Sequence, residues 1–95
     1  MKEMSDPLVY ADYHKTDDRG RVVLACHGTF RDIEKHGISL EEGLALTFYM
    51  DDADDDGNAD ELLVDGVLEY DATSSRWVAV IDRETFRHAS ESRVA

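Results

Sequence analysis

Apolar and polar residues alternate along most of this chain, a pattern typical of half-buried β-strands rather than of long helices. Residues 44–50 give the clearest case, because every second residue there is large and apolar. These residues are Leu44, Leu46, Phe48 and Met50, with Ala45, Thr47 and Tyr49 between them. Successive side chains of a strand point to opposite faces of a sheet. We therefore expect a strand over residues 44–50 with one face in the core.

A hairpin is predicted closer to the N-terminus. Residues 8–15 and 21–30 both read as strands, and the turn residues 17–20 separate them. The register that keeps one face apolar pairs Thr16 with Arg21, Tyr13 with Leu24, and Ala11 with Cys26. In that register Cys26 faces Ala11 and lies beside Leu24, so we expect it to be a buried structural thiol.

A second hairpin is predicted from residues 61–71 and 76–82 around the turn 72–75. The expected pairs are Asp71 with Arg76, Tyr70 with Trp77, Leu68 with Ala79, and Gly66 with Ile81. A glycine in the middle of a strand predicts a bend or a bulge. For the remaining tail we expect a short turn near Phe86 and a last edge strand.

One short helical segment is predicted between the strands. In residues 29–37, Thr29 and Asp32 have the spacing of a capping box, Ile33 supplies an apolar anchor, and Gly37 is a natural terminator. With about five strands and one helical turn, we expect a mainly β fold, a small bent antiparallel barrel. The length fits one domain over residues 1–95, with an ordered core at about 8–90.

Three segments resemble parts of SH3-like barrels. LVYADY is similar to their aromatic opening strand, LEEG followed by LALTFY resembles their diverging turn and second strand, and RWVAVID resembles their Trp-led strand. The resemblance implies an SH3-like fold. The interval from Tyr13 to Gly43 exceeds a standard RT loop, so the proline-binding role of the family is not carried over. The chain also resembles small bacterial proteins of unassigned function.

Charge narrows the range of partners. The chain has 10 Lys and Arg residues against 22 Asp and Glu residues, a net charge of −12. Phosphate groups need a cationic surface, so nucleic acid and anionic membranes are unfavourable partners. A basic protein or a cation is compatible with this charge, as is the general acidity of a salt-adapted proteome. The single Cys26 and the lack of an apolar leader favour the cytoplasm.

An acidic loop offers half of a calcium motif. Alternate carboxylates on a tight turn converge as a hard cation requires, and the candidate ligands are Asp52, Asp54, Asp56, Asn58 and Asp60. Gly57 fits the glycine of an EF-hand loop, but Leu63 stands where that motif has a bidentate Glu. The alternative is a solvated hairpin turn built from residues that favour turns.

The chain contains no catalytic motif and no zinc-binding spacing of His and Cys. We expect a non-enzymatic protein-interaction module without a cofactor. Its predicted surface consists of residues on the outer strand faces, namely Tyr10, Tyr49, Val67, Val78 and Val80. The alternatives are a weak calcium-binding domain using residues 52–60 and an acidic mimic of nucleic acid that occupies a basic protein.

Overall fold

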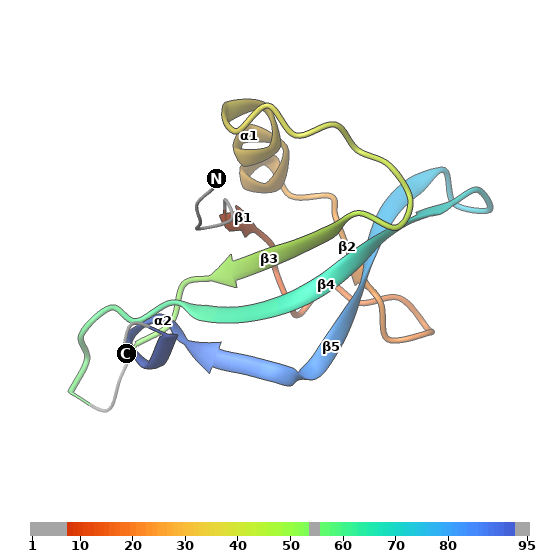
Figure 1. The fold of residues 1–95 in the computed structure, drawn as a ribbon. Helices are drawn as coiled ribbons and strands as arrows, with labels where there is room; N and C mark the ends of the chain where they lie inside the picture. The colour runs from red at the N-terminus through yellow and green to blue at the C-terminus, as the bar shows by residue number, and fades with distance from the viewer. Residues whose placement is uncertain (1–7, 54–55, 93–95) are drawn as a thin grey trace.

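The computed structural model describes residues 8–53 and 56–92, which form a five-stranded sheet with one main helix (Figure 1). The elements in chain order are β1 (Leu8–Tyr10), β2 (Val22–Val23), α1 (His27–Lys35), β3 (Ala45–Met50), β4 (Leu62–Asp71), β5 (Arg76–His88) and α2 (Ala89–Ser92). The strand order across the sheet is β1-β3-β4-β5-β2. No helix in these described residues is long and apolar enough to cross a membrane.

The mainly β fold is confirmed. The sheet curls into a half-barrel, with α1 at the β1 end and the β4–β5 hairpin as its longest part (Figure 1). Three of the four strand pairs are antiparallel, as expected. The exception is β1, which lies parallel to β3, so the sheet is mixed.

The β4–β5 hairpin has the predicted register. Tyr70 faces Trp77, with ring centroids 5.2 Å apart in an edge-to-face arrangement, and Gly66 faces Ile81. A side chain at position 66 would place its Cβ 3.1 Å from the Phe48 ring, so the glycine permits close packing of neighbouring strands. The register shifts next to this glycine, because Asp65 pairs with Asp82 but Leu63 pairs with Arg87, so the extra residues lie in β5.

The prediction for the tail after Ile81 was wrong. Residues 83–88 do not turn away into a separate edge strand but continue β5, and Leu63 pairs with Arg87 beyond the irregularity. Phe86 packs against the core and makes an edge-to-face contact with Tyr13, with ring centroids 5.5 Å apart.

The first predicted hairpin was also largely wrong. Its turn exists, but Thr16 pairs with Val22 rather than with Arg21. Strand β1 ends at Tyr10 and pairs with β3, while residues 27–30 belong to α1. Ala11 and Leu24 are buried as expected, but as core residues of separate segments.

Cys26 therefore occupies a different position from the one predicted. It is the half-buried N-cap residue of α1, not a core thiol on a strand. The end of α1 agrees with the sequence, because Gly37 has a positive φ of 64° and donates its N–H to Glu34. Ile33 is buried as the predicted apolar anchor. The Thr29–Asp32 capping box is absent, since both side chains bond elsewhere.

The core lies on the inner face of the curled sheet. Strand β3 contributes Leu46 and Phe48, which confirms the predicted alternation over residues 44–50. The largest fully buried side chains in the described residues are Phe48, Leu68, Val9, Val22, Val64, Val78 and Thr29. Most of these positions come from the central strands and from the short strands at either edge, so the edges share one core with the hairpins.

Arg21 covers part of the outer face. It precedes the edge strand β2, yet its guanidinium bonds to Glu69 and Asp71 on β4 as well as to Asp17 in the turn. Strand β5 lies between β2 and β4, and Val78 is the β5 residue that pairs with Glu69. The Arg21 side chain therefore reaches across β5 in the region of Val78, and Val78 is fully buried.

Candidate functional site

The free side of β1 is closed by side chains of α1. On its other side, Ala11 donates its N–H to Tyr49 of β3, so the backbone groups of Tyr10 point away from the sheet. The Tyr10 N–H donates to Asp32 Oδ2 at 3.0 Å, and the Tyr10 carbonyl oxygen accepts from Thr29 Oγ1 at 2.6 Å. An unpaired edge strand invites aggregation, and these two bonds remove that possibility at Tyr10.

Asp32 joins the helix to both tyrosines. The Tyr49 hydroxyl donates to the same Oδ2 atom at 3.0 Å, and Arg31 lies 3.5 Å from Oδ1. Burial by itself would raise the pKa of this carboxyl, but hydrogen bonds from Tyr10 and Tyr49 and the charge of Arg31 lower it. Asp32 is therefore an ionised, buried acceptor at neutral pH.

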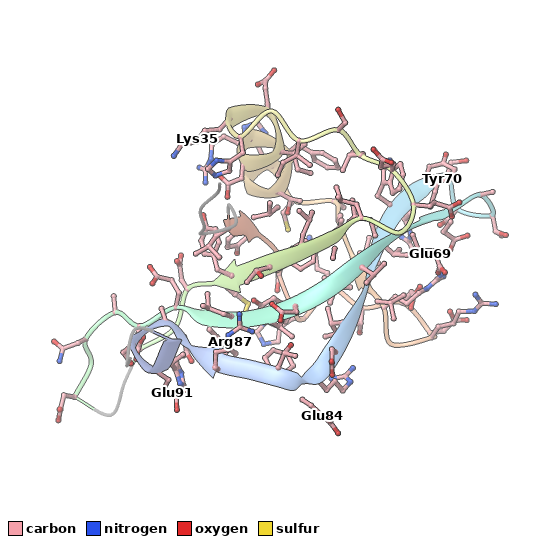
Figure 2. All side chains as sticks on the ribbon, viewed as in Figure 1. Lys35, Glu69, Tyr70, Glu84, Arg87 and Glu91 are labelled. Carbon is pink, nitrogen blue, oxygen red and sulfur yellow. The ribbon has the colours of Figure 1, made fainter. Side chains whose placement is uncertain are left out.

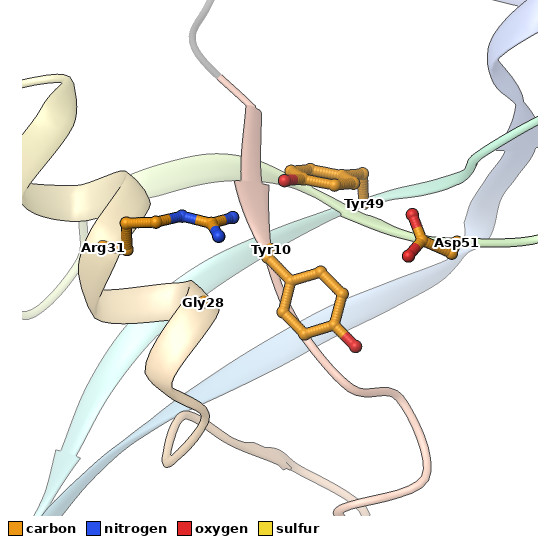
Figure 3. Close-up of a pocket in the computed structure, with 5 residues that line it drawn as sticks. All are labelled: Tyr10, Gly28, Arg31, Tyr49 and Asp51. Atoms are coloured by element: carbon orange, nitrogen blue, oxygen red, sulfur yellow. The ribbon is translucent and has the colours of Figure 1, made fainter.

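An open groove of about 330 Å³ lies beside this contact, lined by Tyr10, Gly28, Arg31, Tyr49 and Asp51 (Figure 3). The two tyrosine rings are edge-to-face, with centroids 5.6 Å apart and planes at 76°. Figure 3 shows Arg31 and Asp51 on opposite sides of the tyrosine pair. The groove thus offers aromatic surface, hydroxyl groups and charges of both signs.

Gly28 sets the shape of this groove. A Cβ at position 28 would lie 3.2 Å from Tyr10 Cδ2, so a larger residue would crowd the ring. The absent side chain allows the first turn of α1 to lie directly against Tyr10.

Both tyrosines are neutral at ordinary pH. Burial is the main cause that raises the pKa of Tyr10, with a further contribution from the nearby carboxylates of Asp12 and Asp51. Burial also raises the pKa of Tyr49, and its hydrogen bond to Asp32 adds to the shift. Neutral phenols offer an aromatic face and a hydroxyl group, both suited to binding.

The structure divides the predicted interaction surface. Tyr10 and Tyr49 meet in the groove, whereas Val67 and Val80 pair across β4 and β5 and are 42% and 46% exposed. Val78 does not contribute, because it is buried. A polar row separates the two groups: Asp65 accepts hydrogen bonds from Thr47 and Arg87 between them. Figure 2 shows Arg87 beside β4.

Two candidate calcium ligands already have partners. Asp52 Oδ2 lies 2.9 Å from His88 Nε2, and Asp60 accepts hydrogen bonds from the backbone and hydroxyl of Ser90. Asp56 and Asn58 are exposed, and Asp54 lies outside the described residues. Within residues 8–53 and 56–92, no group of three or more His, Cys, Asp or Glu side chains could hold a metal.

His88 was missed as a partner of this loop. Its hydrogen bond with Asp52 is the main cause that raises the pKa of the imidazole, burial lowers it, and the charges of Asp60 and Glu91 raise it further. The sequence predicts a turn near Phe86 and a separate edge strand, which does not place His88 beside β4 or the acidic loop.

The lining of the groove was only partly predictable. Tyr10, Tyr49 and Asp51 belong to strands or strand ends and were accessible to sequence reasoning. Gly28 was not, because residues 21–30 were assigned to a strand. Arg31 lies in the predicted helical segment 29–37, but no local pattern placed that segment beside Tyr10 and Tyr49. Nothing in the sequence distinguishes the buried Asp32 from a solvated carboxylate on a helix.

Comparisons with models of known families, with curated proteins and with solved structures find no match to this chain. The functional assignment of the groove therefore rests on its geometry and chemistry.

Proposed function

We propose that this protein is a non-enzymatic interaction module that binds a partner protein at the Tyr10–Tyr49 groove. The observation that carries the proposal is the pair of half-exposed tyrosines held by the buried Asp32, which accepts from the backbone N–H of Tyr10 and from the hydroxyl of Tyr49. Tyrosine is among the residues that contribute most to binding energy in protein interfaces. The groove is also open, as a surface that receives part of another protein must be.

The fixed geometry favours tight binding. Association costs about 0.5–1.5 kcal/mol for each flexible side chain that becomes ordered. The Tyr49 hydroxyl is already held by Asp32, and the Tyr10 backbone is held on both sides. Folding therefore orders much of this surface before a partner binds.

Charge supports a basic partner. The net charge is −12, and Asp51 links the groove to the acidic loop that follows β3. Such a field accelerates the approach of a positively charged protein and disfavours acidic ones. A cytoplasmic setting is part of the proposal and rests on the composition and the single cysteine.

A quantitative capture experiment tests the proposal. Purified protein with Tyr10→Ala is compared with wild type for retention of proteins from native lysate. The matched control is Tyr70→Ala, because Tyr70 is 41% exposed and also contacts another ring, but lies at the far end of the β4–β5 hairpin (Figure 2). We expect Tyr10→Ala to lower the affinity for the retained partner by about tenfold or more, and Tyr70→Ala to leave it unchanged.

A second variant guards against misfolding. Gly28→Ala keeps both rings and has better helix propensity, but its Cβ crowds Tyr10. We expect this variant to unfold no more easily than wild type and to bind the partner more weakly. Equal losses for Tyr10→Ala and Tyr70→Ala, or full binding by both groove variants, would contradict the proposal.

The other two proposals are separated by the same assay. Retention that requires added calcium would favour a calcium-binding domain using residues 52–60. Retention that depends steeply on salt and is unaffected by Tyr10→Ala would favour the acidic mimic of nucleic acid.

A further inference from the structure

We propose that the groove receives a lysine or arginine side chain of the partner, which contacts the tyrosine rings and pairs with Asp51. This inference rests on the proposed function and specifies the chemistry of the residue that the groove accepts. It is carried by the charges of the groove, by its aromatic lining and by its size.

The uncompensated charge of the groove is negative. Arg31 is already paired with Asp32 at 3.5 Å, and Asp32 is ionised. Asp51 is exposed and forms no ion pair or hydrogen bond within the described part of the chain. The three charges therefore sum to one negative charge, and the carboxylate that is free to bind a ligand is that of Asp51.

The aromatic lining favours a cation beside this carboxylate. An ammonium or guanidinium group within about 6 Å of a tyrosine ring centroid is attracted to the negative face of the ring. The rings of Tyr10 and Tyr49 lie between Asp51 and α1 (Figure 3). A basic side chain that pairs with Asp51 from the groove must pass these rings, so its aliphatic part also covers apolar surface.

The volume suits one side chain rather than an independent small molecule. Pockets for drug-sized ligands enclose about 300–1,000 Å³ and bury most of the ligand. This groove, at about 330 Å³, is at the lower limit and is open to solvent. A side chain that is anchored by its own polypeptide needs no enclosure, because the rest of the partner contacts the surrounding surface.

NMR titration with blocked pentapeptides tests the inference. The probes have two glycines on each side of a central lysine, arginine, glutamine or glutamate. We expect the lysine and arginine peptides to shift the ring signals of Tyr10 and Tyr49 and the amide of Asp51 in a saturable way. The glutamine peptide, which has no charge, should cause no saturable shift.

Two matched variants identify the carboxylate. Asp51→Asn should weaken binding of the lysine peptide by about three- to tenfold, because it removes the charge but keeps the shape. Glu84→Gln removes the same charge at an exposed position of β5 on the other side of the molecule (Figure 2) and should leave affinity unchanged. Equal affinity of Asp51→Asn and wild type would overturn the inference, as would preferential binding of the glutamate peptide or no response to any peptide.

The two proposals fail in different ways. If a captured protein depends on Tyr10 but not on Asp51, the interaction module stands and the basic side chain is excluded. If the lysine peptide binds with the expected dependence on Asp51 but capture does not depend on Tyr10, the groove accepts cations and is not the surface that holds the captured partner.

Discussion

The two edges of the sheet are closed by different chemistry. At the β1 edge, Thr29 and Asp32 of α1 bond directly to the backbone of Tyr10 in a buried contact. At the β2 edge, Val23 donates its N–H to Lys15, and Arg21 holds the region together by pairing with three carboxylates. One edge depends on short buried hydrogen bonds, and the other depends on a network of charges.

The two closures also differ in what they leave uncovered, and the candidate site lies at the β1 edge. Bonds to the backbone leave the Tyr10 and Tyr49 rings free to line a groove. At the β2 edge the long Arg21 side chain reaches across β5 to Glu69 and Asp71 in the region of the buried Val78, while Val67 and Val80 on the same hairpin stay exposed. The side chains of Thr29 and Asp32 end at the edge backbone and leave the neighbouring rings uncovered, whereas the Arg21 side chain extends across a neighbouring strand.

The largest expected effect is the loss of Asp32. Asp32→Ala removes the acceptor for the Tyr10 N–H and for the Tyr49 hydroxyl and should lower the free energy of unfolding by about 2–4 kcal/mol. Asp32→Asn retains one carbonyl oxygen and should lose less. Urea unfolding followed by circular dichroism measures both. A loss for Asp32→Ala below about 0.5 kcal/mol, typical of exposed positions, would contradict the buried-acceptor model.

Arg21→Met should have a smaller effect that depends on salt. The variant keeps much of the apolar length that crosses β5 but leaves Asp17, Glu69 and Asp71 near one another without their cation. We expect a lower urea midpoint than wild type, and a difference that changes between about 50 mM and about 500 mM NaCl because salt screens charges. The deficit of Asp32→Ala should be nearly constant over the same range. If Arg21→Met and Asp32→Ala responded to salt identically, the two edges would not differ in how far their stability depends on charge.

Acid pH should weaken both edges. Burial opposes ionisation of Asp17, but hydrogen bonds from Arg21 and Arg19 lower the pKa of its carboxyl below the ordinary 3.8, and the pKa of Asp32 is also lowered. Because these folded-state values are depressed, the stabilisation is complete above the unfolded-state value and is lost as pH falls through the folded-state values. The urea midpoint should decline below about pH 4, and less steeply in Arg21→Met. If the urea midpoint of Arg21→Met declined with pH as steeply as that of wild type, the acid sensitivity would not arise from the pairing of Asp17 with Arg21.

The smallest effect is expected at the exposed His88–Asp52 pair. This pair tests whether a single surface ion pair contributes as much stability as the ion pairs of Arg21. The raised pKa of His88 means that its stabilisation is fully present below the unfolded-state value of 6.5. The stabilisation is lost as pH rises through the higher folded-state value. Wild type should therefore exceed His88→Gln in urea midpoint only at the acidic end of a titration across neutral pH. A constant difference at all pH values would show that packing, not charge, accounts for it.

The predictable parts of the fold are those whose partners are close in sequence. The turn 72–75 joins β4 directly to β5. One register of this hairpin makes both favourable pairs, Tyr70 with Trp77 and Asp71 with Arg76, and the structure has that register. Strand β3 was predictable because Leu46 and Phe48 alternate with more exposed residues. Local geometry and alternation restrict such elements to one solution.

The first third of the chain was not predictable in this way. Strand β1 has three residues, and its partner Phe48 lies far along the chain from Val9. The alternation in residues 8–15 is compatible with a local hairpin or a distant parallel partner. The choice depends on the burial of Val9 against β3 and on the bonds that α1 offers to Tyr10, neither of which is a local property.

The sequence alone determined a mainly β protein, the strand over residues 44–50, the register of its last hairpin and a net charge of −12. Only the tertiary structure brought Gly28, Arg31 and Asp32 of a helix beside Tyr10 and Tyr49 and made them a groove. The physical reason is that alternation and turn chemistry act between neighbours along the chain. The groove instead depends on unpaired backbone groups of an edge strand, whose partner is decided when the whole sheet closes.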